Sequence, residues 1–275
     1  MGTDIMTKSY QQELDFALSL VRATARVVLQ YFDQGVSVVA KSDGSPVTIA
    51  DKEVENTIRN AIAQKYPDDS ILGEEGGETT AEKASRKWIV DPIDGTYNFA
   101  RHIPIWSTLI ALESEGEIVM GVVAAPAMHE CFYACKGQGA FKISGDLSQE
   151  QSFQNPRSIR VSDNDSLDKS GFNFGTPDRI HKIGKWDAFT RAVLATERQR
   201  GYGDYLGFAH VFEGKSEAML ETGVKPWDLA PMKIIVEEAG GIFFDLSGGK
   251  SIYPGSCIVS NKNVANAFKD IFVNG

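Results

Sequence analysis

The chain has 275 residues, of which 42% are hydrophobic and 24% charged, and its formal net charge is -9. These values are ordinary for a folded globular protein, and the length allows one large core or two subdomains packed together. Because an acidic surface repels nucleic acid and anionic lipid, we expect neither as a partner, although bound cations would still admit an anionic substrate.

The first half of the chain is predicted to be α+β with antiparallel hairpins. Apolar residues recur every three or four positions from Leu14 to Phe32, which predicts an amphipathic helix of about 25 residues. After a polar loop at 41–46, Thr48 and Asp51 give the S/T-x-x-D signal for the start of a second helix. Strands are expected at 70–73, 88–90, 108–112, 118–124, 130–134 and 140–143.

The second half of the chain has an alternating pattern that is closer to α/β. It follows a polar segment at 144–157, which predicts a linker or a long surface loop. Strands are expected at 158–162, 170–175, 216–221, 242–245 and 257–260, and helices at 184–197, 228–239 and 264–272. We therefore expect an α+β subdomain at 1–145 and an α/β subdomain at 146–275, which together form one compact domain.

The cysteines and the N-terminal segment bear on the cellular compartment. Cys131, Cys135 and Cys257 are odd in number and have no zinc-finger spacing, so we interpret them as reduced structural thiols. The N-terminus has no basic start followed by an apolar stretch, and no apolar run reaches the roughly 20 residues of a membrane span. We expect a cytoplasmic protein without a membrane partner.

The segment 91–96, DPIDGT, is the most informative part of the sequence. Its two aspartates lie three positions apart where a predicted strand ends, and the turn brings both carboxylates and the Ile93 carbonyl to one side. Such an all-oxygen set suits a hard cation like Mg²⁺ and not Zn²⁺. The amides of Gly95 and Thr96 then lie at a helix N-terminus, which favours phosphate binding. The alternative is a Pro/Gly turn in which Asp94 only caps the helix.

Three further segments place carboxylates at the ends of predicted elements. Glu74 and Glu75 follow a strand, Asp228 heads a helix in the segment KPWDLA, and Asp51 begins the second helix. Each has a simpler interpretation: a solvated acidic turn, an N-cap and a capping box, respectively. The four segments nevertheless occur together, each at the end of an element, which argues against coincidence.

These motifs resemble those of a known family. The glutamate pair at 74–75, WIVDPIDGT at 88–96 and PWDLA at 226–230 with the trailing EEAGG are similar to the metal-binding motifs of the inositol monophosphatase superfamily. The resemblance covers essentially the whole chain. It implies a layered αβαβα sandwich of the inositol monophosphatase and sugar phosphatase type, with the active site between two subdomains. It also implies a homodimer that hydrolyses a small phosphorylated substrate with Mg²⁺ and is inhibited by Li⁺.

The resemblance assigns metal ligands position by position. It implies that Glu74, Asp91 and the carbonyl of Ile93 hold a first Mg²⁺, and that Asp91, Asp94 and Asp228 hold a second. Two metal ions roughly 3.5–4 Å apart can activate a water, bind the phosphoryl oxygens and neutralise the leaving oxygen. No Cys or His nucleophile is needed, and the four histidines are scattered along the sequence.

Other roles also follow from the resemblance. Thr96 and Asp51 match the pair that orients and deprotonates the attacking water, and Glu74 is the next candidate for that role. Gly95 and Thr96 supply the phosphate-binding amides. Glu75 contacts the metal ligands without itself touching the two ions, or it helps to hold a weaker third Mg²⁺.

The residues expected to contact the leaving group are compatible with two different substrates. RGYGDY at 200–205 and the KPWD form resemble the histidinol-phosphate phosphatase branch, and a carboxylate such as Asp204 suits the ammonium of histidinol. Glu221, however, lies seven residues before Asp228, where inositol phosphatases place a carboxylate that binds ring hydroxyls. The simpler interpretations are a helix start for Asp204 and a strand end for Glu221.

We therefore place histidinol phosphate first and inositol 1-phosphate second. Nucleoside 3′,5′-bisphosphate and fructose 1,6-bisphosphate rank below them, because Arg200 and Lys225 are the only basic residues in the pocket segments. The non-enzymatic alternative is a regulatory binding protein that retains the fold. Intact metal ligands argue against that alternative.

Overall fold

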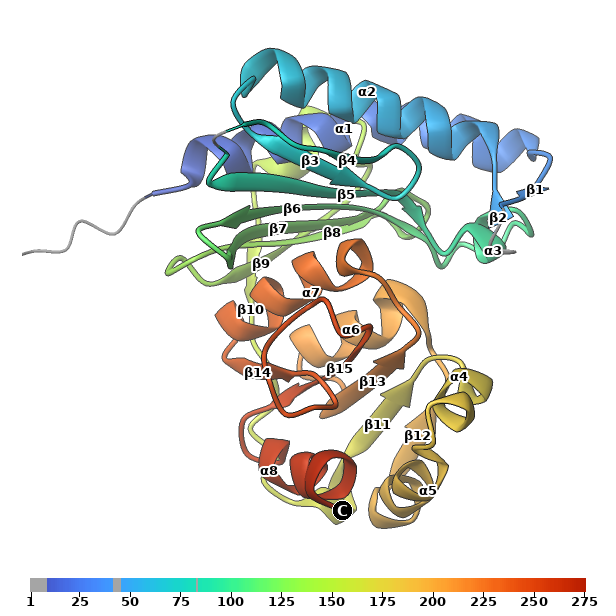
Figure 1. Cartoon of the computed structure of the whole chain (residues 1–275), viewed down its shortest axis with the longest axis vertical. Helices are drawn as coiled ribbons and strands as arrows, with labels where there is room; N and C mark the ends of the chain where they lie inside the picture. Colours follow the sequence, from blue (N-terminus) through green and yellow to red (C-terminus); the bar gives the residue numbers. More distant parts are fainter. Residues whose placement is uncertain (1–8, 42–45, 83) are drawn as a thin grey trace, which may run out of the picture.

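The computed structural model describes residues 9–41, 46–82 and 84–275, so residues 42–45 of the predicted polar loop lie outside it. Helices and sheets alternate in five layers, with a helix pair above the larger sheet, a second pair between the sheets and three helices below the smaller sheet (Figure 1). From top to bottom the helices are α1 (Gln11–Gln34) and α2 (Ile49–Lys65), α6 (Asp204–Phe212) and α7 (Pro226–Glu238), and α4 (Pro177–Lys182), α5 (Trp186–Ala195) and α8 (Ala265–Lys269). This confirms the predicted αβαβα sandwich.

The two N-terminal helices form where the sequence predicts them. Helix α1 buries Leu14, Val21 and Val28 against the larger sheet, which follows from their helical spacing. Helix α2 begins with the predicted capping box, because the amide of Thr48 donates to Asp51 Oδ2 over 2.8 Å while the Thr48 hydroxyl oxygen accepts from the amide of Ala50 over 3.1 Å. The capping box fixes the direction of the Asp51 side chain at the start of α2.

The larger sheet has eight strands in the order β10-β9-β8-β7-β6-β5-β3-β4, and all neighbours are antiparallel except β3 and β5. Its strands are β3 (Ser70–Gly73), β4 (Gly77–Thr79), β5 (Arg86–Asp94), β6 (Ser107–Ser114), β7 (Glu117–Ala125), β8 (Glu130–Cys135), β9 (Ala140–Ser144) and β10 (Arg157–Ile159). The sequence predicts that the strand at 88–90 ends before Asp91, and this prediction is wrong for β5. The strand continues to Asp94 because β5 stays paired with β6 beyond an irregularity between the two aspartates.

The predicted linker at 144–157 leads the chain back to the larger sheet. It contains a 3₁₀ turn at Glu150–Phe153 and leads into β10, which pairs with β9. The larger sheet therefore extends to Ile159. The division of the chain into subdomains at residue 145 stays a prediction.

The smaller sheet combines parallel and antiparallel pairs in the order β12-β11-β13-β15-β14. Its strands are β11 (Gly171–Phe174), β12 (Arg198–Arg200), β13 (Ala218–Thr222), β14 (Gly241–Phe244) and β15 (Ser256–Asn261). Helix α4 and strand β12 were not predicted, because elements of six and three residues are too short to show a period. The remaining short elements are β1 (Val39–Ala40), β2 (Pro46–Val47) and α3 (Thr96–Phe99).

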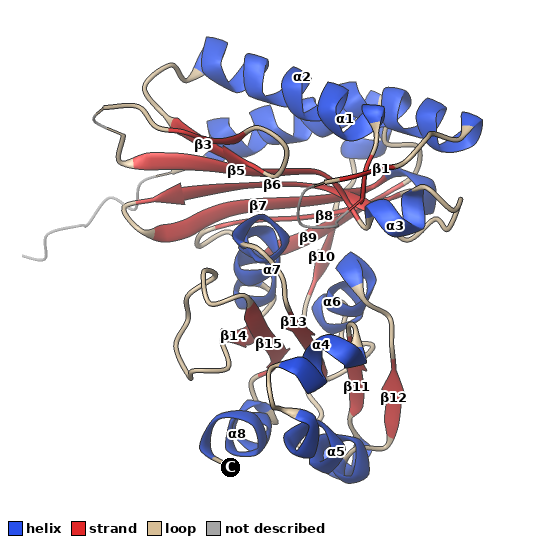
Figure 2. Cartoon of the chain, turned by 45° about the vertical axis from the view of Figure 1, so that its right-hand side comes forward, coloured by secondary structure: helices blue, strands red, loops and turns tan. Residues whose placement is uncertain are grey.

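Helix α7 is the central element, because it packs against strands of both sheets (Figure 2). Leu229, Met232 and Ile235 are buried in the core between the layers. The helix approaches β7 so closely that a Cβ atom on Gly121 would lie 2.7 Å from the Cα of Pro231. Residue 121 must therefore be glycine for α7 to dock at this depth.

Two predictions about the whole chain can be compared with the structure. Cys131, Cys135 and Cys257 are buried and unpaired, which confirms their interpretation as structural thiols. Within the described ranges, no helix is both long and apolar enough to cross a membrane.

Candidate active site

A cavity of about 1130 Å³ lies at the N-termini of α3, α6 and α7, where β3, β5 and β13 end. Its wall brings together most of the residues that the sequence predicts for the site: Glu74, Asp91, Ile93, Asp94, Gly95, Thr96, Asp204, Glu221 and Asp228. Asp51 and Glu75 are the two predicted residues outside this wall. Each joins the site through a single side-chain contact, Asp51 with Thr96 and Glu75 with Lys41.

The centre of the cavity is a cluster of three carboxylates, Asp91, Asp94 and Asp228, each with an oxygen within 4.8 Å of the others. Strand β5 supplies the first two and the first turn of α7 supplies the third. The backbone holds two of them, because the amide of Ile93 donates to Asp91 Oδ1 over 3.0 Å and the amide of Lys225 donates to Asp228 Oδ2 over 2.7 Å. Asp228 is thus both a helix cap and a member of the cluster, so its two interpretations are compatible.

Electrostatics make this cluster unfavourable without a counter-ion. Burial raises the pKa of Asp91 and Asp94 well above the usual aspartate range, and the charges of neighbouring carboxylates raise it further. Burial also raises the pKa of Asp228, although hydrogen bonds oppose this effect. A divalent cation would remove the repulsion, and three carboxylates with a nearby carbonyl are the hard oxygen donors that such an ion prefers. The donor set therefore fits Mg²⁺.

Glu74 and Glu75 follow β3 and lie beside this cluster. Glu74 is opposite Asp91 across the β3–β5 pair, and its amide donates to the Val90 carbonyl over 3.2 Å. Lys41 Nζ lies 2.7 Å from Glu74 Oε1 and 2.6 Å from Glu75 Oε1, so it bridges the two carboxylates. Burial raises the pKa of Glu74 to about 7 against the opposing effect of Lys41.

The side chains of Thr96 and Asp51 meet at the edge of the cavity. Thr96 Oγ1 lies 3.2 Å from Asp51 Oδ1 and 3.0 Å from the Ile93 carbonyl oxygen, so its proton can be donated to either. The other carboxylate oxygen of Asp51 accepts from the amide and hydroxyl of Thr48. The capping box of α2 thus points Oδ1 of Asp51 at the Thr96 hydroxyl, and the capping and functional interpretations of Asp51 coexist.

Gly95 separates the carboxylate cluster from α3. It has a left-handed backbone with φ of 83°, which favours glycine, and a Cβ there would lie 3.0 Å from the Ile105 carbonyl oxygen. Gly95 and Thr96 both face the cavity. The short helix begins at Thr96, so these two residues lie at a helix N-terminus as the sequence predicts.

The opposite side of the cavity carries Asp204 and Glu221. Asn98 Nδ2 donates to Asp204 Oδ2 over 2.6 Å and to the Ile105 carbonyl over 2.8 Å. Asp204 has a φ of 52°, an uncommon conformation that Asp tolerates better than most residues. Burial raises the pKa of Asp204 to about 6 and that of Glu221 to about 8. Glu221 lies so close to Gly175 that a Cβ there would come within 1.9 Å of Glu221 Oε1.

Sequence reasoning missed several polar residues of the cavity, among them Lys41, Asn98 and Arg179. Arg179 comes from α4 and donates to the carbonyl of Gly223 over 3.0 Å. Its helix could have been found from Thr176-Pro177, which is a helix-start signal with proline at the first position. Asn98 and Lys41 have no comparable signal, because their partners lie far away along the chain.

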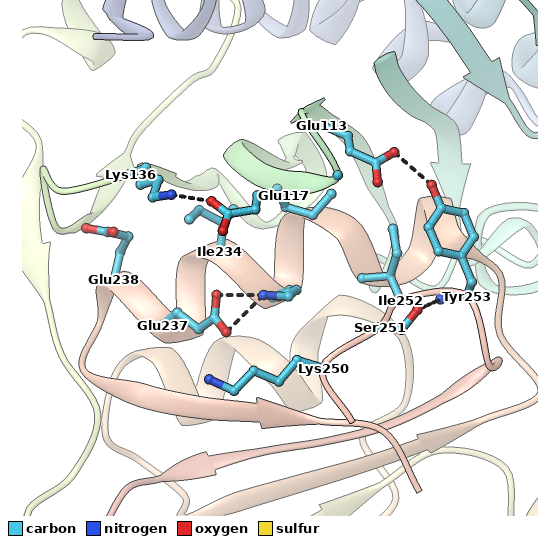
Figure 3. Close-up of a pocket in the computed structure, with 13 residues that line it drawn as sticks. Glu113, Glu117, Lys136, Ile234, Glu237, Glu238, Lys250, Ser251, Ile252 and Tyr253 are labelled. Carbon is cyan, nitrogen blue, oxygen red and sulfur yellow. Dashed lines mark hydrogen bonds and ion pairs between the residues drawn. The ribbon is translucent and has the colours of Figure 1, made fainter. Parts of the chain in front are cut away.

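A second cavity, of about 620 Å³, lies at the other end of α7 (Figure 3). Its charged side chains pair mostly with one another. Lys233 Nζ lies 2.9 Å from both carboxylate oxygens of Glu237, and the Tyr253 hydroxyl donates to Glu113 Oε2 over 2.7 Å. None of the predicted site residues lines this cavity, so the candidate active site is the larger one.

Comparisons with known proteins agree with this arrangement. The model of the inositol monophosphatase family matches residues 9–271, so the chain belongs to this family. It is an enzyme of the phosphoric monoester hydrolase class, which confirms the predicted class.

Relatives with different names share this fold. A histidinol-phosphatase of Mycobacterium tuberculosis is 37% identical over 251 residues, which cover 90% of this chain and 93% of that protein. A fructose-1,6-bisphosphatase/inositol-1-monophosphatase of Thermotoga maritima is 37% identical over 238 residues, covering 86% of this chain and 85% of the relative. The crystal structure of the extragenic suppressor protein SuhB from Bartonella henselae has a TM-score of 0.84 at 28% identity, and the match covers 96% of this chain and 99% of that one.

Proposed function

We propose that this enzyme hydrolyses a small phosphate monoester with Mg²⁺ as cofactor, and that histidinol phosphate is its preferred substrate. The observation that carries the proposal is the buried carboxylate cluster beside the Thr96–Asp51 pair. The cluster supplies a site for divalent cations, and the pair supplies a route for a proton. Phosphate monoesters are inert enough to require both.

The carboxylates of Glu74, Asp91, Asp94 and Asp228 would hold two Mg²⁺ ions, with the Ile93 carbonyl as a further ligand. When bound, the ions lower the pKa of a water and neutralise charge on the phosphoryl oxygens. The raised pKa values of these carboxylates are consistent with the role, since a cation would reverse the repulsion that causes them. A weaker third ion near Glu75 stays a prediction.

Thr96 and Asp51 would move the proton of the attacking water. Thr96 Oγ1 donates its own proton to Asp51 Oδ1, which leaves an oxygen lone pair free to accept a hydrogen bond from the water. Because Oδ2 of Asp51 is already occupied by Thr48, Oδ1 is the atom that receives the proton. Burial raises the pKa of Asp51, which makes it a stronger base than an exposed aspartate.

The leaving group would lie against Asp204 and Glu221. Two buried carboxylates suit a cationic alcohol such as histidinol, and the relative from Mycobacterium tuberculosis is named for the same reaction. The positive charge of Arg179 opposes the rise in the pKa of both carboxylates and so favours their charged forms. Inositol 1-phosphate is the second candidate, because Glu221 can also accept hydrogen bonds from ring hydroxyls.

A phosphate-release assay on four substrates tests the proposal: histidinol phosphate, inositol 1-phosphate, fructose 1,6-bisphosphate and adenosine 3′,5′-bisphosphate. With Mg²⁺ present, we expect the highest kcat/KM for histidinol phosphate. After chelation of the metal with EDTA, we expect no hydrolysis of any of the four substrates. Equal rates with and without EDTA would contradict the metal mechanism. A preference for inositol 1-phosphate would leave the mechanism intact and replace the substrate.

Membership of the inositol monophosphatase family suggests two further features, which are proposed here with their tests. Family membership favours a homodimer, which sedimentation of the purified chain would test. It also favours inhibition by Li⁺ that is uncompetitive with substrate, which steady-state kinetics would test.

A further inference from the structure

Glu55 is a buried carboxylate in α2 that neither the metal cluster nor the water pair accounts for. It lies one helical turn after Asp51, and only 1% of its surface is exposed. Both of its oxygens accept hydrogen bonds from the turn after β3. The amide of Glu75 donates to Oε2 and the amide of Gly76 to Oε1, each over 2.7 Å. Charge-assisted bonds of this kind are about twice as strong as neutral ones.

The turn is shaped around this carboxylate. A Cβ atom on Gly73 would lie 2.3 Å from Glu55 Oε1, and one on Gly76 would lie 2.9 Å from the same oxygen. Arg59 closes the outer side, because its guanidinium lies 3.5 Å from Oε1 and donates to the Gly77 carbonyl over 2.9 Å. Glycines at 73 and 76 therefore allow Glu55 to reach two backbone amides at once.

The two amides belong to the segment that carries Glu74 and Glu75. Glu74 faces the cavity opposite Asp91, while Glu75 meets Lys41. Within the described ranges, the other hydrogen bonds between this segment and α2 come from Arg59, which contacts Gly77 and Thr79 at the exposed side. The orientation of Glu74 thus depends on a residue that does not itself line the cavity.

We propose that Glu55 is a positioning residue for the metal site, because it fixes the turn from which Glu74 reaches the cation. This inference rests on the proposed function, since it takes Glu74 to be a Mg²⁺ ligand. It also gives α2 a double role: Asp51 orients the Thr96 hydroxyl and Glu55 orients the glutamate turn, from positions one turn apart. One rigid helix then sets the distance between the proton acceptor and the metal ligand.

The test compares Glu55→Gln with Glu53→Gln by titration calorimetry with Mg²⁺ on the purified enzyme. Glutamine at 55 keeps one acceptor oxygen but turns an NH₂ group toward the second amide. Loss of such a supporting partner typically weakens metal affinity about 10- to 100-fold, and we expect a change of this size. Glu53→Gln is the matched control, because Glu53 is exposed on the same helix and its carboxylate bonds only to Tyr31 among the described residues.

Melting temperatures separate positioning from simple stabilisation. A residue that only stabilises the fold would lower the melting temperature equally with and without Mg²⁺ and leave the Mg²⁺ dissociation constant unchanged. That outcome would overturn the inference. If the wild-type chain bound no Mg²⁺ at all, the proposed function would fail instead.

Gly76→Ala provides a second test of the inference if Glu55→Gln does not fold. Residue 76 is exposed, and the added Cβ pushes on Glu55 Oε1 without removing the carboxylate. We expect weaker Mg²⁺ binding than in the wild type, by a smaller factor than in Glu55→Gln. Wild-type affinity in Gly76→Ala would count against the inference.

Discussion

The two sides of the active-site cavity are built differently. On the metal side, regular elements supply the carboxylates and backbone amides hold them, as for Asp91 in β5 and Asp228 in α7. On the leaving-group side, the amide of Thr222 donates to Glu221 Oε1 over 3.1 Å, but Asp204 is held by the side chain of Asn98. A contact from a backbone amide survives most substitutions of its donor residue, whereas a side-chain contact does not. Asp204 is therefore the carboxylate whose support can change most readily between relatives.

The largest effect should come from Asp91→Asn on the metal side. Loss of one charge from a residue placed between the expected ions should cost about 4 kcal/mol of transition-state stabilisation, or about three orders of magnitude in kcat. The protein should stay folded without metal, because the change relieves repulsion with Glu74, Asp94 and Asp228. Stopped assays and thermal melts in EDTA measure both effects. Near-normal Mg²⁺-dependent turnover would refute the metal assignment.

Thr96→Ala tests the proton route between the two sides. The variant keeps the backbone amides that are expected to bind phosphate, and it removes the hydroxyl that bonds to Asp51 together with the γ-methyl group. We expect kcat to fall about a hundredfold with little change in KM, the pattern of an interaction made mainly in the transition state. Steady-state kinetics at saturating Mg²⁺ measure both constants. An increase in KM alone would make Thr96 a binding residue, and Glu74 would become the candidate that activates water.

On the leaving-group side, Asp204→Asn and Glu221→Gln should change the preference between substrates and leave the mechanism of hydrolysis unchanged. If Asp204 pairs with the ammonium of histidinol, its loss should cost about 1.5–3 kcal/mol for histidinol phosphate and little for inositol 1-phosphate. Glu221→Gln should show the opposite bias if ring hydroxyls bind there. The measurement is kcat/KM for both substrates with both variants. Equal small losses in all four cases would mean that neither carboxylate contacts the leaving group.

The smallest effect concerns stability and pH in the metal-free enzyme. The folded-state pKa is about 7 for Glu74 and about 8 for Glu221, above the usual glutamate value, so the folded chain binds more protons than the unfolded chain. Stability must then fall as pH rises from 6.5 to 8.5, and we expect the melting temperature in EDTA to drop by about 5 °C. Added Mg²⁺ should reduce the drop. A melting temperature that rises with pH over this range would contradict the raised pKa values.

The difference between the two sides also explains what the sequence could predict. Asp91, Asp94 and Asp228 lie in two local sequence motifs, and the structure brings them into one cluster. Asn98 could not be assigned in this way, because its partner Asp204 lies 106 residues further along the chain. Local patterns report chain neighbours, whereas a pair of this kind depends on how two sheets pack.

Strand β5 and helix α4 illustrate the other limits. The apolar run at 88–90 predicts a strand only as far as Val90, but pairing with β6 carries the strand on to Asp94 across an irregularity. Helix α4 spans Pro177–Lys182 and is too short for a periodic signal, so Arg179 was not recognised as part of the cavity.

Asp228 comes from α7, which docks between the two sheets, while Asp91 and Asp94 lie more than 130 residues earlier. During synthesis, a chain that ends before α7 already carries two of the three clustered carboxylates. The third arrives only when α7 closes onto β6 and β7. A chain cut before α7 therefore has an incomplete cluster, whatever part of it has already folded. Such a chain lacks Asp228 and cannot bring the three carboxylates together.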